Sequence, residues 1–286
     1  MTTETIPVDG RDLEVLRHGP PDAFPLAFHC GTPNAPDEFP ALFDAVTAKG
    51  WQLVAHARPG YSRSTRQEGR TVADVAGDLA AILDRLGLGE FATLGWSGGG
   101  RHALACAALL PDRCTAAASL AGVAPYDAEG LDFLAGMGPE NVEEFGAAAR
   151  SRAELRELLD RFADPLRDIS GEQVAGELGG LIDDVDRGAL TGEFADVMAR
   201  MLRRALSTGT DGWFDDDIAF INPWGFDLDD ITVPVSIWQG AHDRMVPFAH
   251  GQWLAAHIPG ARVHLYDDEG HLSLVDQLPR ILDDLS

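Results

Sequence analysis

Apolar residues along this chain follow two alternating patterns as far as about residue 123. Short apolar runs of strand length are separated by segments in which apolar residues recur at helical spacing. Residues 5–16 alternate in polarity and turn at Asp9-Gly10, which predicts an N-terminal hairpin. The apolar runs expected to form strands in this half are 25–29, 51–56, 91–96 and 115–123. This alternation predicts an α/β fold, a mostly parallel, doubly wound sheet with helices on both faces.

The helix expected over residues 71–86 has the clearest pattern in the sequence. Thr71 and Asp74 resemble a capping box at its start, and Gly87 ends it. One apolar stripe runs along it, formed by Val72, Val75, Leu79, Ile82, Leu83 and Leu86. A helix with one apolar stripe packs that face on a sheet, which fits the fold inferred above.

The alternation stops near Pro125, and no convincing strand follows until residue 233. Helices are expected in this stretch over residues 154–162 and 194–206 and, on a weaker pattern, 178–185. Strand character returns at 233–238 and 262–266, and a final helix is expected over 272–285.

We therefore expect an α/β core, residues 1–125 and 231–286, interrupted by a helical cap, residues 126–230. The alternative is a group of surface helices with no role in binding substrate. A cap is favoured, because open α/β sheets bind their ligands at the carboxyl ends of the strands.

The formal charge of the 286 residues is 22 − 46 = −24, which excludes a nucleic-acid-binding surface and disfavours anionic membranes as partners. No run of about 18 apolar residues occurs, and residues 1–5 do not resemble a secretory signal. Cys30, Cys106 and Cys114 have no metal-binding spacing and are expected to be free thiols. We expect a cytoplasmic protein whose partner is a small-molecule substrate; its oligomeric state is left open.

Gly95-Trp96-Ser97-Gly98-Gly99 lies between the strand expected at 91–96 and a helix at 101–110. Strand, tight turn and helix is the context in which a Gly-x-Ser-x-Gly pattern forms a nucleophile elbow. The turn exposes the Ser97 hydroxyl, and the Gly98 N–H points at whatever the serine attacks. Glycine-rich turns alone are common, and the flanking elements are what make this pattern specific.

A serine nucleophile needs a base, and the base needs a carboxylate to orient it. Asp243 and His271 each follow a strand expected in the last part of the chain, so Ser97, Asp243 and His271 occur in the order that successive loops of one sheet would give. The other candidates are His242, His102 and His29 for the base and Asp127 for the acid.

The second oxyanion donor is expected from the turn after residue 29. Thr32 is preferred there, with Cys30 and Gly31 as alternatives one or two residues away. Trp96, Trp213, Phe214 and Trp224 either line a substrate pocket or pack in the core. No metal and no cofactor are expected, since the sequence contains no Walker loop, His-Glu-x-x-His or Cys-x-x-Cys.

Taken together, these motifs resemble the α/β-hydrolase superfamily, in its capped branch. The resemblance is carried by residues 31–34, by Arg58-Pro59-Gly60-Tyr61-Ser62, by the elbow, by Gly240-Ala241-His242-Asp243 and by Gly270-His271. It implies Ser97 as nucleophile, Asp243 as acid, His271 as base, and Thr32 and Gly98 as oxyanion donors. The chain departs from the family pattern at Cys30, where histidine is usual, and at Ser62, where the second glycine is usual.

The resemblance implies a serine hydrolase that cleaves a carboxylic ester, thioester or lactone through an acyl-enzyme on Ser97. Two other reactions could use the same residues: hydrolysis of a C–C bond, and perhydrolysis of the cofactor-free haloperoxidase kind. An alternative of another class is a ligand-binding protein with this fold and no turnover. The acidic cap favours neutral or cationic substrates over anionic ones.

Overall fold

A computed structural model describes all 286 residues of the chain. Eight strands form a single sheet in the order β1-β2-β4-β3-β5-β6-β7-β8. The strands are β1 (Thr2–Val8), β2 (Arg11–His18), β3 (Pro25–His29), β4 (Gln52–His56), β5 (Phe91–Trp96), β6 (Cys114–Leu120), β7 (Val235–Gly240) and β8 (Arg262–Tyr266). The first hairpin pairs antiparallel and β2 pairs antiparallel with β4, while all other pairs are parallel. The α/β fold with a mostly parallel sheet is confirmed.

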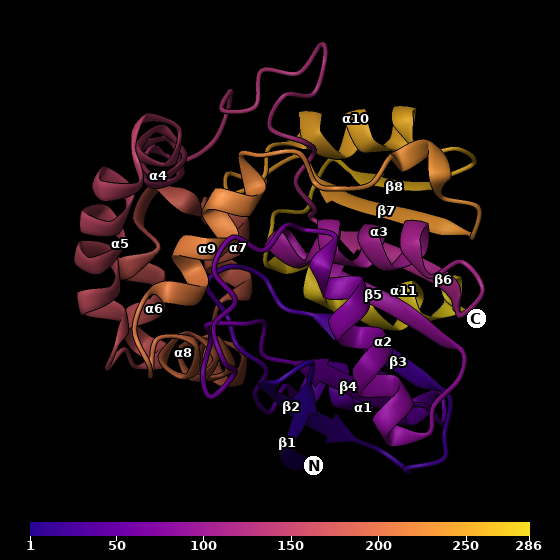
Figure 1. Cartoon of the computed structure of the whole chain (residues 1–286). Coiled ribbons are helices and arrows are strands. Elements are labelled where there is room, and N and C mark those ends of the chain that lie inside the picture. Colours follow the sequence, from indigo (N-terminus) through magenta and orange to yellow (C-terminus); the bar gives the residue numbers. More distant parts are fainter.

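Helices cover both faces of this sheet (Figure 1). The first face carries α1 (Pro40–Ala48) and α11 (Leu278–Asp284), whose apolar side chains share one core with strand residues. The second carries α2 (Asp74–Leu86), α3 (Gly100–Leu109) and α10 (Phe248–His257), which share a second core. The sheet is therefore buried on both sides, as the continuous apolar runs of its parallel strands require.

The chain between β6 and β7 contains helices and no strand, as the sequence pattern predicts. We call residues 126–230 the helical insertion. Figure 1 shows its helices stacked beside the sheet. They are α4 (Pro139–Arg150), α5 (Arg152–Leu166), α6 (Gly171–Glu177), α7 (Asp184–Ala189), α8 (Gly192–Ala205) and α9 (Asp211–Phe220). No helix of the protein has both the length and the apolar character needed to cross a membrane.

Two of the expected helices differ in the structure. The helix expected from Thr71 begins only at Asp74, and Thr71 lies just before it and donates its N–H and its hydroxyl to the Asp74 carboxylate. The helix expected over 178–185 is wrong: a 3-10 turn ends at Leu181, and a new helix begins at Asp184, where Asp183 Oδ1 accepts hydrogen bonds from the N–H groups of Val185 and Asp186.

Two other boundaries also move. The strand expected over 115–123 ends at Leu120, and Ala121 has a positive φ of 49° that is incompatible with a strand. The final helix begins at Leu278, after a 3-10 turn over Ser273–Gln277.

A buried carboxylate, Asp216 on α9, connects the helical insertion to the sheet loops. It accepts hydrogen bonds from Arg70 at 2.6 Å, from the Tyr61 hydroxyl at 2.8 Å and from Thr32 Oγ1 at 2.7 Å. The Arg58 guanidinium also donates to it, at 2.5 Å for the shortest contact. Burial alone would raise the pKa of Asp216, but the charges of the two arginines hold it well below its usual range.

We predict that Asp216→Asn destabilises the protein by about 3–5 kcal/mol, because it leaves two buried guanidinium groups without their counter-charge. A carboxylate with a depressed pKa stabilises the fold above its unfolded pKa of about 3.9, and this contribution is lost as the pH falls. Urea unfolding between pH 7 and pH 3 measures both effects. The difference between wild type and variant should shrink as the pH falls below about 4.

Asp215 supplies the matched control, since the neighbouring Asp215→Asn removes a pair with the partly exposed Arg66. Asp215→Asn should lower the free energy of unfolding by clearly less than Asp216→Asn does. Equal losses in the two variants would contradict a special role for the Asp216 cluster.

Candidate active site

The tight turn between a strand and a helix, in which the sequence places Ser97, occurs where the sequence predicts it. β5 ends at Trp96, Ser97 follows with a φ of 56°, and α3 begins at Gly100 after a single 3-10 turn. A Cβ on Gly95 would collide with the Gly99 carbonyl, and a Cβ on Gly99 would collide with the His29 carbonyl. Only glycine fits either position, so the turn can be tight enough to hold Ser97 in a left-handed backbone conformation.

Asp243 and His271 come together at the same edge of the sheet. Asp243 lies three residues after β7 and His271 five residues after β8, and His271 Nδ1 lies 2.7 Å from Asp243 Oδ2. The carboxylate also accepts hydrogen bonds from Gln239 Nε2 and from the N–H groups of Met245 and Val246. Four partners fix this buried carboxylate, which in turn fixes the imidazole.

The charge of His271 is stabilised despite its burial. Burial lowers the pKa of this ring, but the charge of Asp243 and its hydrogen bond outweigh that effect and raise the pKa above the ordinary 6.5. An imidazole with this pairing can take up a proton and hold it next to a carboxylate.

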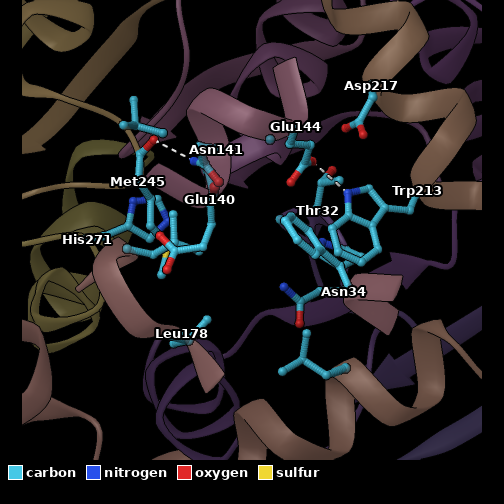
Figure 2. A pocket seen from close by; sticks show the side chains of 18 of the residues that line it. Thr32, Asn34, Glu140, Asn141, Glu144, Leu178, Trp213, Asp217, Met245 and His271 are labelled. Carbon is cyan, nitrogen blue, oxygen red and sulfur yellow. Dashed lines mark hydrogen bonds between the residues drawn. The ribbon is translucent and has the colours of Figure 1, made fainter. Parts of the chain in front are cut away.

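Ser97 and His271 line one pocket of about 270 Å³. Ser97 Oγ makes no hydrogen bond with any protein group, so it is free to meet a ligand. Contacts between a nucleophile and its base are often looser before substrate binds. Figure 2 shows His271 on one wall of the pocket, with Thr32 and Trp213 across from it.

The turn after β3 lies next to the elbow because His29 pairs with Gly95 in the sheet. A Cβ on Gly98 would lie 2.7 Å from Thr32 Oγ1, so these two residues are direct neighbours. The Thr32 N–H donates to no protein group. Thr32 and Gly31 line the pocket and Cys30 does not. The choice of Thr32 over Gly31 as a donor stays a prediction.

The other candidates for base and acid have different surroundings. His242 Nδ1 lies 2.8 Å from Asp183 Oδ2 on the helical insertion. His102 is buried beside the Phe220 ring, and the buried His29 ring lies 3.7 Å from the Cys106 sulfur. Asp127 lines a separate surface pocket with Trp224. None of these four groups lines the pocket that contains Ser97.

Two of the four aromatic residues expected near a substrate line the pocket. They are Trp96 and Trp213. Phe214 does not line the pocket, because it follows Trp213 on α9 and points to another side of that helix. There Arg156 Cζ lies 4.1 Å from the centre of the Phe214 ring. Trp224 lies beyond the end of α9 and packs against Phe226. Phe214 and Trp224 therefore pack in the core, which is the other alternative that the sequence allows for them.

Asp186 is a site residue that the sequence did not reveal. It lies on α7 with no exposed surface and accepts hydrogen bonds from three consecutive N–H groups: His271 at 3.0 Å, Leu272 at 2.7 Å and Ser273 at 3.1 Å. A carboxylate of the helical insertion thus holds the loop that carries His271. The sequence contains no signal for this contact, which joins residues 85 positions apart.

No three His, Cys, Asp or Glu side chains gather in an arrangement that would hold a metal ion. The three cysteines are free and buried, and burial raises the pKa of the Cys30 thiol to about 12.

The fold and this site define the class of protein. Residues 25–278 match the family described as alpha/beta hydrolase fold, and the chain belongs to that family. It is an alpha/beta hydrolase.

Relatives within the family are similar over most of their length. The chain is 29% identical to the non-heme chloroperoxidase of Streptomyces lividans over 84% of this chain and 82% of that protein. It is 27% identical to the bifunctional esterase/perhydrolase of Acinetobacter calcoaceticus, with the same two coverages. The crystal structure of the enol-lactonase from Burkholderia xenovorans superposes with a TM-score of 0.69 at 20% identity, over 99% of each chain. At 20% identity, this structural similarity supports the fold alone.

We predict that Asp186→Asn lowers the pKa of His271, because the negative charge of Asp186 contributes to raising it while the amide oxygen can still accept a hydrogen bond. An NMR titration of the His271 ring measures the effect. Asp183→Asn is the matched control, since Asp183 lies just before the same helix and pairs with His242 instead. An unchanged His271 pKa in Asp186→Asn would show that Asp186 has no electrostatic influence on that ring.

Proposed function

We propose that this protein is a serine hydrolase that cleaves a small-molecule carboxylic ester, thioester or lactone through an acyl-enzyme on Ser97. The observation that carries the proposal is the buried contact of 2.7 Å between His271 and Asp243, with His271 facing the same pocket as the strained Ser97. A serine becomes a useful nucleophile at neutral pH only with such a base beside it.

In this mechanism His271 accepts the Ser97 proton as the hydroxyl oxygen attacks the substrate carbonyl. Asp243 holds the ring in the required tautomer and stabilises its charged form. The N–H groups of Thr32 and Gly98 donate to the oxyanion of the tetrahedral intermediate. His271 then protonates the leaving alcohol or thiol, and a water molecule activated by the same ring releases the acid and restores Ser97.

We further propose that the helical insertion is a cap that determines which substrates enter. In support, it supplies much of the pocket lining, including Phe145 and Phe162 from its first two helices and Met198 and Trp213 from its last two. An apolar lining with a few polar groups is typical of sites that bind small molecules.

A second reaction is supported by the names of the two relatives. In perhydrolysis, hydrogen peroxide replaces water in the attack on the acyl-enzyme, so the products are a peracid and free Ser97. One relative is named as an esterase and perhydrolase and the other as a chloroperoxidase. Peracid formation from acetate and hydrogen peroxide, compared with ester hydrolysis in the same preparation, separates the two reactions.

We predict that a fluorophosphonate probe labels Ser97 and that the labelling requires His271. Ser97→Ala and His271→Ala should each lower kcat for an activated ester by about 10⁴–10⁶-fold, because the triad acts as a unit. Peptide mass spectrometry locates the label. His242→Ala is the control, since this histidine lies outside the pocket and should leave the labelling intact.

A folded protein that neither takes the label nor turns over any ester would favour the ligand-binding alternative. Turnover that survives Ser97→Ala would also overturn the proposal.

The pH dependence of kcat/KM should follow His271. The ring accepts a proton only when it is neutral, so kcat/KM is expected to fall as the pH drops through a pKa raised above 6.5. Asp243→Asn removes the charge that raises this pKa, so the acidic limb should move to lower pH while kcat falls by about 10⁴-fold. An acidic limb that does not move would contradict the pairing.

A further inference from the structure

Three buried ionisable side chains in the pocket wall take no part in the proposed mechanism. They are Glu144 on α4, Asp217 on α9 and Arg101 on α3, and all three line the pocket that contains Ser97. Asp217 and Arg101 have no exposed surface; no guanidinium nitrogen of Arg101 has a hydrogen-bond partner, and the carboxyl group of Asp217 has only the neighbouring Glu144 carboxyl group as a partner. Buried polar groups without partners are costly, so a ligand that supplies partners would bind favourably here.

Glu144 and Asp217 form a pair of facing carboxyl groups. Figure 2 shows them turned toward each other beside Trp213, whose indole N–H donates to Glu144 Oε1 at 2.7 Å. Burial raises the pKa of Glu144 to about 7, and burial together with the neighbouring Glu144 raises the pKa of Asp217 well above its usual range. Two buried carboxyl groups this close share one proton near neutral pH, so the pair carries a single negative charge.

Arg101 supplies the opposite charge. Its Cζ lies 3.5 Å from the centre of the Phe220 ring, which holds the guanidinium in place without satisfying its N–H groups. Burial lowers the pKa of Arg101 to about 9, so the group stays charged at neutral pH. The nearby Asp216 is already paired with Arg58 and Arg70. The single charge of the carboxyl pair and the charge of Arg101 therefore balance.

We propose that Glu144, Asp217 and Arg101 form a polar subsite that binds a neutral hydrogen-bonding group of the substrate, a hydroxyl or a primary amide. The ligand oxygen accepts from Arg101, and the ligand O–H or N–H donates to a carboxylate oxygen of the pair. Such a group gives the unpartnered Arg101 guanidinium an acceptor and gives the carboxyl pair a further donor. The inference rests on the proposed function, since it makes this pocket the substrate pocket and selects hydroxyl- or amide-bearing esters within the class.

Charged groups fit this subsite less well. An ammonium or a carboxylate would add a formal charge to a cluster that is already balanced, and the carboxyl pair would have to lose or gain a proton to compensate. A methyl group would leave the buried donors and acceptors without partners. The substrate series that tests the subsite therefore needs all of these end groups.

The test uses p-nitrophenyl esters of straight-chain acids from pentanoate to octanoate, each ending in a methyl, hydroxyl, primary amide, ammonium or carboxylate group. For the chain length that reaches the subsite, kcat/KM of the hydroxyl or amide ester should exceed that of the methyl ester by about tenfold or more. The ammonium and carboxylate esters should show no such gain.

The preference should be lost in Arg101→Met and in Asp217→Asn, measured as the ratio of hydroxyl to methyl kcat/KM within each variant. Glu144→Gln is a further variant at the same pair in case one of these does not fold. Glu143→Gln is the matched control, because Glu143 lies on the same helix, is exposed and pairs with Arg161. It should keep the wild-type ratio.

Equal rates for hydroxyl, amide and methyl esters at every chain length would overturn the subsite, as would the highest rate for the ammonium or carboxylate ester. A preference that survives in every folded variant of Arg101, Asp217 and Glu144 would also overturn it. Turnover without preference refutes the subsite alone. Absence of both turnover and fluorophosphonate labelling refutes the proposed function, and the subsite with it.

Discussion

The ion cluster around Asp216 is the interaction on which the arrangement of the site depends. One buried carboxylate of α9 accepts hydrogen bonds from Arg58, Arg70, Tyr61 and Thr32, which lie in the loops after β3 and β4. Arg58 also donates to the carbonyls of the two residues before Thr32. Arg58 thus holds the backbone of the turn proposed to bind the oxyanion, and the Thr32 side chain connects this turn to Asp216 of the helical insertion. A buried charge of this kind is tolerated only because every partner is in place.

A second carboxylate of the insertion acts at the opposite wall of the pocket. Asp186 holds the backbone of the His271 loop, while Asp216 holds the Thr32 turn. The insertion is therefore connected directly to the two segments that flank Ser97, and it also lines the pocket. A displacement of these helices would change the pocket shape and the positions of the reacting groups together. In the proposed function, this coupling gives a physical route by which a substrate bound beneath the insertion influences the proposed chemistry at Ser97.

Much of the core and of the candidate site could be predicted from the sequence, because local patterns encode them. β3 and β8 occur at the residues expected, and the elbow follows from glycines that nothing else could replace. Asp186 and Asp216 could not be predicted, since their contacts join residues up to 184 positions apart and depend on how the helices pack. The same limit explains why the sequence could not place Phe214 outside the pocket, because it does not indicate which side of a short helix faces a pocket.

Mass spectrometry of the protein, quenched during turnover of an activated ester, tests whether Ser97 carries the acyl group. We expect an acyl group on the peptide that contains Ser97, formed faster than product accumulates in the steady state and absent in Ser97→Ala. Hydrolysis without an acylated peptide, or an acyl group on another residue, would contradict the proposed role of Ser97.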